Sequence, residues 1–303
     1  VALSLGAVIE RSSNQAVSQD RNDPNASLGW KHLTPTSEFN LNARYLEESA
    51  RAAELRQAGV VVSDTTRTTK GVAARWTSLL TERLNYTLGA FYSAITYADN
   101  DPVLIDYNTY GGRFTLGYQI SSRDEVYWLT DGSRYEPTET GFDSTYYGSM
   151  LGFKQRISDT LDWDIRGGWL TIDGQGDEST WQGMLQLNYT GEQSRFDVNV
   201  GRIANPTGIY EGFVVSNQAR ARYSFEFSER TTLGLDGSWI KNMETITYPE
   251  STSKIVGAWA NYELDQFWSL RLRAERRETD YQSNGNAVGN LVGLTLLYQH
   301  PDF

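Results

Sequence analysis

The chain has 303 residues, of which 39% are apolar and 13% aromatic, with 27 glycines but only 7 prolines. Its 27 basic and 38 acidic residues give a net charge of −11, which argues against nucleic-acid binding, because phosphates require a basic surface. Cysteine is absent, so disulfides, thiolate nucleophiles and cysteine-ligated metals are excluded. No run of apolar residues is close to the length of about 18 residues that a transmembrane helix requires. A mean hydropathy of −0.51 is still compatible with a membrane barrel, whose strands turn alternate polar residues inward.

A period-two alternation of apolar and polar residues, typical of β-strands, runs along almost the whole chain. In chain order it predicts strands around residues 39–45, 72–80, 84–92, 114–120, 161–169, 181–189, 196–200, 219–227, 233–239, 256–264, 268–272 and 288–298, with weaker segments at 1–11, 26–33, 125–134 and 145–157. These are about sixteen strands of roughly ten residues, the length that a tilted membrane-spanning strand requires. The chain starts at Val1 within such a pattern, without a methionine or signal peptide, so we expect it to be an excerpt of a longer protein.

The connections between these strands are of two kinds. Short polar turns fall at 34–37, 81–83, 121–124, 158–160, 191–193, 228–230 and 265–266, and longer loops alternate with them at 12–25, 47–70, 97–107, 135–144, 173–179, 205–212, 241–251 and 279–286. Bacterial outer-membrane barrels have this asymmetry, with short turns in the periplasm and long loops outside the cell. An even number of strands then places both termini in the periplasm.

A soluble β-sandwich is the alternative to a barrel, because its strands also alternate. The polar face here carries charges on nearly every strand, however, and a sandwich would bury them unpaired. A barrel turns them toward water inside and gives the apolar face to lipid. Aromatic residues mark both membrane interfaces: Tyr86, Trp163, Tyr189, Tyr262 and Trp268 on one side, and Tyr92, Trp169, Trp181 and Trp239 on the other. We therefore predict one all-β domain over 1–303, a transmembrane antiparallel barrel of about sixteen strands in the bacterial outer membrane.

Sixteen strands enclose an aqueous channel, so transport is the expected function. The strand register predicts a lumen wall with the charged residues Glu38, Arg44, Arg75, Arg113, Asp164, Arg166, Arg220, Arg222, Asp236, Arg271 and Arg273 and the aromatic residues Phe91, Tyr127 and Trp259. Acids and bases on this wall nearly balance, which also fits simple cross-strand charge pairs. The aromatic rings could stack on sugars or merely fill gaps in the wall.

The net acidity lies in the long loops, whose charges sum to about −12. The predicted acidic pore mouth consists of Asp99, Asp101, Asp106, Glu136, Glu139, Asp143, Asp173, Asp177, Glu178 and Glu211. Such a mouth would attract cations by focusing the electric field at the opening. The alternative is a solvated surface whose acids bridge divalent cations between lipopolysaccharides.

The segment 47–59 interrupts the strand pattern within the longest loop. It consists of strong helix formers, begins with acids and ends with Arg56 before a glycine suited to a left-handed cap. We expect a short helix there, and its charged residues Glu47, Arg51, Glu54 and Arg56 make it a candidate gate or constriction of the pore. A helix lying on the outer surface is the alternative.

Features of enzymes and metal proteins are weak. The stretch 173–178 has the composition of a calcium loop but not the spacing of an EF-hand. His32 falls at the turn end of its strand and His300 beyond the last strand, which leaves no base for serine-type catalysis at the loop face. We expect no enzymatic activity, no metal and no cofactor.

The chain resembles the C-terminal porin domains of synthase-dependent exopolysaccharide export proteins, the group that handles Pel, poly-N-acetylglucosamine and cellulose. The resemblance covers essentially all residues and rests on the sixteen short-turned strands, the start at a strand, the acidic mouth and the terminal aromatic Phe303. It implies export of a polysaccharide through the outer membrane, with upstream periplasmic helical repeats, an outer-membrane lipoprotein partner, and contacts with lipid and lipopolysaccharide. The domains that export the cationic Pel polymer are the most similar, although the near-neutral lumen wall departs from a uniformly acidic pore.

Two other functions stay open. A general diffusion porin would have the same strands and an inward-folded constriction loop. A structural or adhesive barrel that anchors a partner would conduct nothing.

Overall fold

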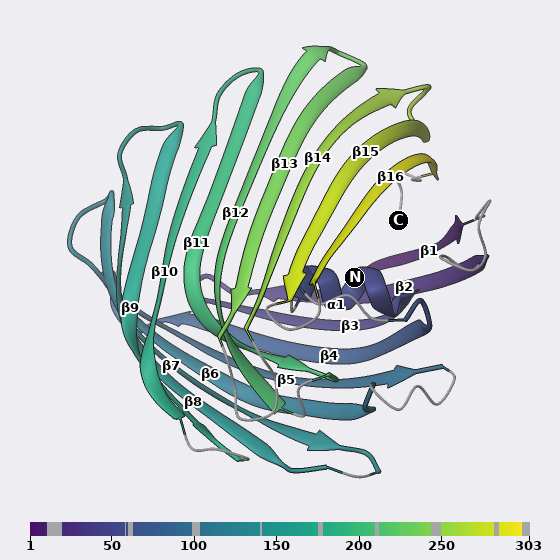
Figure 1. Cartoon of the computed structure of the whole chain (residues 1–303). Coiled ribbons are helices and arrows are strands. Elements are labelled where there is room, and N and C mark those ends of the chain that lie inside the picture. Colours follow the sequence, from purple (N-terminus) through teal and green to yellow (C-terminus); the bar gives the residue numbers. More distant parts are fainter. Residues whose placement is uncertain are drawn as a thin grey trace.

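The computed structural model describes residues 1–10, 20–57, 59, 63–98, 104–139, 141–174, 178–209, 212–243, 250–281 and 285–298. They form one sheet of sixteen antiparallel strands, each paired with its neighbour in the sequence from β1 to β16. The sheet curls into a barrel (Figure 1), which confirms the predicted fold and strand number. The edge strands β1 and β16 come to the same side of the barrel, without a hydrogen-bonded ladder between their described residues.

The strands are β1 (Ala2–Glu10), β2 (Arg21–Leu33), β3 (Ser37–Ser49), β4 (Thr66–Leu79), β5 (Leu84–Tyr97), β6 (Tyr107–Gln119), β7 (Asp124–Pro137), β8 (Ser144–Arg156), β9 (Leu161–Asp173), β10 (Glu178–Thr190), β11 (Ser194–Thr207), β12 (Gly212–Ser228), β13 (Thr231–Asn242), β14 (Ser251–Glu263), β15 (Trp268–Tyr281) and β16 (Gly285–Tyr298). One helix, α1 (Ala50–Gln57), follows β3. In the described part of the chain, no helix is long and apolar enough to cross a membrane.

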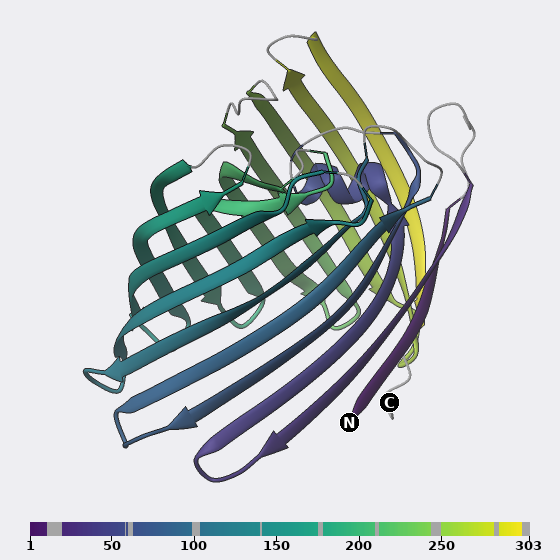
Figure 2. The same cartoon turned by 90° about the horizontal axis from the view of Figure 1, so that it is seen from below.

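Hydroxyl and carboxylate side chains fold the short turns locally. The Leu84 amide donates to Thr81 Oγ1 at 3.0 Å, the Asp124 amide to Ser121 Oγ at 3.1 Å, and the Phe267 amide to Asp265 Oδ1 at 2.7 Å. Such bonds reverse the chain without a long connection. β1 begins and β16 ends at this turn end of the barrel, as Figure 2 shows.

Most strands are longer than the roughly ten residues that the bilayer requires. β12 has 17 residues, and β4 and β7 have 14 each. The extra length lies at the loop end, so that residues 66–70, 135–137 and 205–207, predicted as loop, belong to strands. The barrel wall therefore continues beyond the apolar band on that side.

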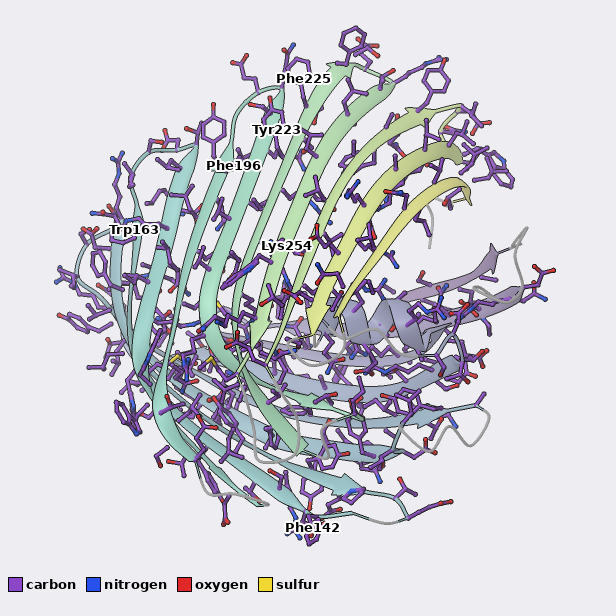
Figure 3. The ribbon with its side chains drawn as sticks, in the orientation of Figure 1. Phe142, Trp163, Phe196, Tyr223, Phe225 and Lys254 are labelled. Atoms are coloured by element: carbon purple, nitrogen blue, oxygen red, sulfur yellow. The ribbon has the colours of Figure 1, made fainter. Side chains whose placement is uncertain are left out.

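The outward register carries the apolar side chains. Leu151 is 71% exposed, Trp169 59% and Leu235 58% on the isolated chain, exposures that a water-soluble surface would not tolerate over so many strands. Figure 3 shows aromatic rings of this register, such as Trp163 and Tyr223, along the barrel strands. Trp169 and Trp181 are directly paired across β9 and β10. This face is the lipid-facing surface of the barrel.

Candidate functional site: the narrowed lumen

The helix α1 lies inside the barrel near its loop end (Figures 1 and 2). Ala50, Ala53, Glu54 and Leu55 are at most 2% exposed. Ser49 begins the helix, because its Oγ accepts a hydrogen bond from the Ala52 amide at 3.1 Å. The helix is thus not the outward-lying surface helix that the sequence left open.

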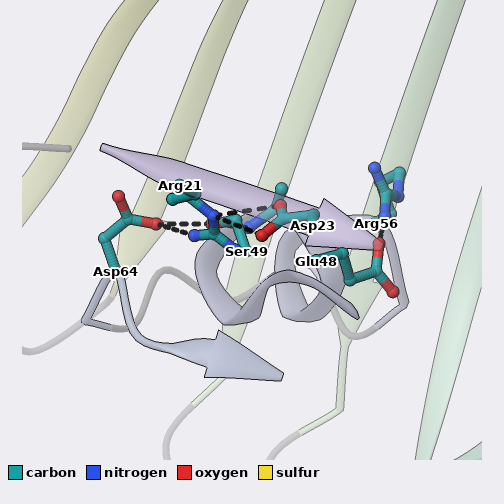
Figure 4. Close-up of polar contacts among 7 residues, drawn as sticks. Arg21, Asp23, Glu48, Ser49, Arg56 and Asp64 are labelled. Atoms are coloured by element: carbon teal, nitrogen blue, oxygen red, sulfur yellow. Dashed lines mark hydrogen bonds and ion pairs between the residues drawn. The ribbon is translucent and has the colours of Figure 1, made fainter. Parts of the chain in front are cut away.

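A buried polar cluster fastens the start of α1 to β2 (Figure 4). Arg21 donates to Asp23 at 3.0 Å and to Asp64 at 3.0 Å, and all three side chains are at most 7% exposed. Ser49 Oγ donates to the same Asp64 carboxylate at 2.6 Å. The cluster ties the residues before and after the helix to one strand of the wall.

The other end of α1 reaches the opposite wall. Gln57 Nε2 donates to the Pro206 carbonyl of β11 at 2.6 Å, and Arg220 Nη2 of β12 donates to the Arg56 carbonyl at 2.9 Å. Arg56 also forms an ion pair with Glu48 of β3. The helix therefore bridges the lumen from β2–β4 to β11–β12.

Glu54 is the most completely buried charged residue of the helix, with 0% exposure. Its carboxylate accepts hydrogen bonds from the Tyr97 hydroxyl at 2.6 Å and from Thr207 Oγ1 at 3.4 Å, and Arg67 Nη1 lies 3.7 Å away. Burial raises the pKa of the Glu54 carboxyl, and the Arg67 guanidinium opposes that shift. One side chain thus joins β4, β5 and β11 through the helix.

The ends of β11 and β12 also leave the wall and fold into the lumen. The β10–β11 ladder stops at the pair Gly183 and Arg202. At this point the Arg202 guanidinium lies 5.2 Å from the Trp181 ring and donates to Thr180 Oγ1 at 3.1 Å and to Asn217 Oδ1 at 3.5 Å. Arg202 therefore stabilises the point at which the β11–β12 hairpin separates from β10.

The folded-in hairpin packs on apolar residues of the inner wall. Phe213 lies 5.7 Å from Tyr146, measured between ring centroids, and it also packs against Tyr107 and Tyr135, which stack at 4.7 Å and are fully buried. Val215 joins Tyr146 in a second cluster with Leu170 and Ile172. The prediction that residues 205–212 form a loop outside the barrel is wrong for its described residues. They fold inward because the hairpin packs on apolar side chains of the inner wall on β5–β9.

The fourteen residues predicted for the lumen wall all lie on the inward register. A cavity of about 570 Å³ beside α1 is lined by Arg44 and Phe91, and one of about 900 Å³ by Arg75, Arg113, Tyr127 and Arg166. A third cavity, of about 780 Å³, is lined by Arg220, Arg222, Asp236 and Arg273. The fourth, of about 620 Å³, lies at the turn end and is lined by Asp164. Glu38 pairs with Lys31 at 3.0 Å, and Arg271 lies 5.3 Å from the Trp259 ring.

Cross-strand ion pairs join part of this wall. Arg113 pairs with Asp131 at 2.8 Å, and Arg273 pairs with Asp236 at 2.7 Å. Tyr127 donates to Asp164 and is only 5% exposed, so it fills the wall.

The candidate mouth acids are only partly described. Asp99, Asp101, Asp177 and Glu211 lie outside the described residues. Asp106 accepts the Tyr97 amide at 2.8 Å, and Asp143 and Glu136 both pair with Arg134, at 2.6 and 3.0 Å. The prediction that Glu136, Asp173 and Glu178 lie in loops is wrong, because β7, β9 and β10 extend beyond the apolar band and include them. Glu139 is exposed between β7 and β8.

The candidate gate residues separate into two groups. Glu54, Arg56 and Arg51 belong to α1, which spans 50–57 rather than 47–59. Glu47 lies in β3 and accepts from the Tyr45 hydroxyl on the outward register, so it is not part of the helix. The pairing of β3 with β4 continues to Ser49 and keeps Glu47 in the wall.

Sequence reasoning missed Arg21, Asp64, Arg67 and Arg202. Arg67 continues the inward register of Arg75, so it could have been found by extending the predicted strand at 72–80 toward the N-terminus. The pairing of Arg21 with Asp64 is a contact between segments 43 residues apart, for which the sequence carries no local signal. No group of acidic or histidine side chains suited to a metal ion occurs among the residues that the structure describes.

No protein-family model matches the chain, and no curated protein sequence matches it. Solved structures share its fold. The FrpB iron transporter from Neisseria meningitidis (F3-3 variant) has a TM-score of 0.55 and 9% identity and covers 93% of this chain and 57% of its own. The copper transporter OprC has a TM-score of 0.51 and 9% identity, with 93% and 56% covered. FpvA from P. aeruginosa, in complex with a pyoverdine and iron, has a TM-score of 0.53 and 11% identity, with 92% and 52% covered.

This chain thus spans just over half the length of the structures that it matches. At such low identity the likeness shows the fold alone. The chain has the fold of an outer-membrane β-barrel, which transporters and channels use.

Proposed function

We propose that the protein is an outer-membrane channel in which polar solutes pass beside α1, with α1 and the β11–β12 hairpin as a built-in constriction. The observation that carries the proposal is the complete burial of Glu54, which contacts three different strands from within the lumen. A barrel that served only as an anchor would have no need to hold a charged helix across its interior. The charged inner wall keeps the remaining space filled with water.

The inward-folded helix favours a diffusion channel over an open conduit. Both of its ends are fastened, one by the Arg21 cluster and one by Gln57 and Arg220. Segments held this way set a fixed size limit for solutes. The cavities that remain beside α1, of about 570 and 780 Å³, have room for solutes the size of small sugars.

Export of an exopolysaccharide is the finer candidate. A ring exposed to the lumen supports it: Phe91 is 41% exposed and lines the cavity beside α1. Such a ring can stack on a sugar face without binding it tightly. Tyr127 supports the candidate less, because its ring is buried in the wall. The upstream periplasmic repeats, the lipoprotein partner and contacts with lipopolysaccharide belong to this candidate.

Liposome swelling tests the channel. Vesicles that contain the purified chain should admit a monosaccharide rapidly and exclude a dextran of several kilodaltons. Vesicles that stay closed to every solute would refute the channel and favour an anchoring barrel. Deletion in the native bacterium then separates the two candidates, because loss of surface polysaccharide supports export, whereas normal polysaccharide with reduced uptake of small solutes supports diffusion.

A further inference from the structure

Two arginines meet where the helix touches the opposite wall. Arg220 Nη2 of β12 donates to the carbonyl of Arg56, which places the two guanidinium-bearing residues side by side at the end of α1. Both residues line the cavity of about 570 Å³ and also the cavity of about 780 Å³. The two cavities therefore adjoin at this arginine pair, and a solute that moves between them passes it.

Basic residues outnumber acidic residues around this arginine pair. Among the described residues that line the smaller cavity, Glu48 is the one acid, and it pairs with Arg56. Arg44 lines the same cavity, and neither Arg44 nor Arg220 has an ion pair within the described parts of the chain. The constriction thus carries exposed positive charge.

The larger cavity beside the pair is also basic. Arg273 and Arg277 in its lining share Glu275, and Arg273 also holds Asp236. Arg222 makes no ion pair among the described residues, although Asp197 and Asp236 are its ladder neighbours. The turn-end cavity differs, because its lining combines four bases with four acids: Arg123, Lys154, Arg156 and Arg166 with Asp124, Glu125, Asp162 and Asp164. The cavity of about 900 Å³ has a similar excess, because Arg75, Arg113, Lys154 and Arg166 face Glu125 and Asp131 in its described lining, so positive charge continues along the inner wall from α1.

We propose that Arg44, Arg56 and Arg220 form an anion filter, so that the permeating solute carries carboxylate, phosphate or sulfate groups. The inference rests on the proposed channel function and names the charge class of its solute. Guanidinium groups suit this role, because they stay charged and bind oxyanions through two parallel hydrogen bonds. Rings of arginine give pores their preference for anions in general. The filter reverses the cation preference that the acidic loops suggested.

The first test is the reversal potential of the purified full chain in a planar bilayer under a potassium chloride gradient. The unmodified chain should prefer chloride. The double variant Arg56→Gln/Arg220→Gln should lower the permeability to chloride about fivefold per charge, the effect of one charge at about 4 Å in water, and should raise the permeability to potassium. The ratio of chloride to potassium permeability should therefore fall by more than fivefold per charge. The matched control Arg156→Gln/Arg195→Gln removes two exposed arginines at the turn end and should leave the ratio nearly unchanged.

The second test uses the unmodified chain, so it does not depend on the folding of a variant. Dextran sulfate, neutral dextran and diethylaminoethyl-dextran of one length are added to the loop side of the open channel. Dextran sulfate should block at a concentration at least tenfold lower than neutral dextran does. Equal block by these two polymers, stronger block by the cationic dextran, or a potassium-selective channel would overturn the filter and leave the channel function intact. A chain that never conducts would overturn the channel function itself.

Discussion

Replacing Glu54 by alanine should release α1 from the barrel wall. The variant leaves the Arg67 guanidinium, 7% exposed, without its counter-ion and the Tyr97 hydroxyl without its acceptor. Removal of one partner from a buried ion pair costs about 3–5 kcal/mol. At about 1.4 kcal/mol for each factor of ten, the docked population should fall by a factor of about a hundred to a few thousand relative to the released one. The strand ladders contain no bond to this side chain, so the barrel should still assemble.

Cysteine labelling measures the release directly, because the natural chain has no cysteine. Ala53 is 2% exposed on the same helix, so the variant Ala53→Cys should react slowly with a charged maleimide in the folded barrel. The reaction should become fast in Ala53→Cys/Glu54→Ala. Heat-modified migration on a gel verifies that both barrels are folded.

The double variant Glu54→Ala/Arg67→Met provides the control. Because it removes both charges of the buried pair, it should label more slowly than Glu54→Ala alone. Equal labelling of Ala53→Cys with and without Glu54→Ala, in barrels shown to be folded, would refute the conclusion that Glu54 holds the helix.

Two further predictions follow from the wall. Leu235→Arg on the lipid-facing register should cost about 2–4 kcal/mol near the midplane, whereas Gln186→Arg in the turn-end cavity should cost much less; denaturant unfolding in vesicles measures both, and equal costs would contradict the register. Gly168→Ala should destabilise by about 1–3 kcal/mol, because its Cβ would lie 1.9 Å from the Ser149 carbonyl oxygen. Gly167→Ala, whose nearest contact is 3.9 Å, should be harmless in the same assay.

The barrel could be predicted from the sequence because the bilayer imposes a strict alternation on every strand. Leu235 and Trp169 face lipid only if their neighbours Asp236 and Gly168 face inward, and a shift of one residue would reverse all of them. The same register placed Arg44 and Arg220 on the inner wall. Strand ends were harder to predict, because beyond the apolar band both faces meet water and the alternation stops.

The inward fold of β11 and β12 could not be predicted from this segment alone, because its apolar residues Ile209, Phe213 and Val215 do not show which surface they pack on. The signal lay on other strands, where Tyr107, Tyr135 and Leu170 occupy inward positions that water would otherwise wet. Apolar residues on the inner wall of a wide barrel indicate that another segment packs on them. Which segment does so depends on contacts such as that between Phe213 and Tyr146, far apart in the chain.

The charge of the pore was misleading for a similar reason. A sum over loop residues counts Asp143 and Glu136 as free acids, although both pair with Arg134. It also overlooks Arg220, whose position beside Arg56 depends on the docking of α1. Composition gives the number of charges, and only their partners decide the field that a solute meets.

Single-channel conductance tests the central claim most directly. The natural chain is compared in planar bilayers with a variant in which Ala50–Gln57 is replaced by a glycine–serine linker of the same length. If α1 is the constriction of a channel, the natural chain should show discrete openings and the variant a conductance several-fold larger, since a barrel of sixteen strands is wide enough for an aqueous pore. Equal conductance of the two chains, or no conductance in either, would contradict the account.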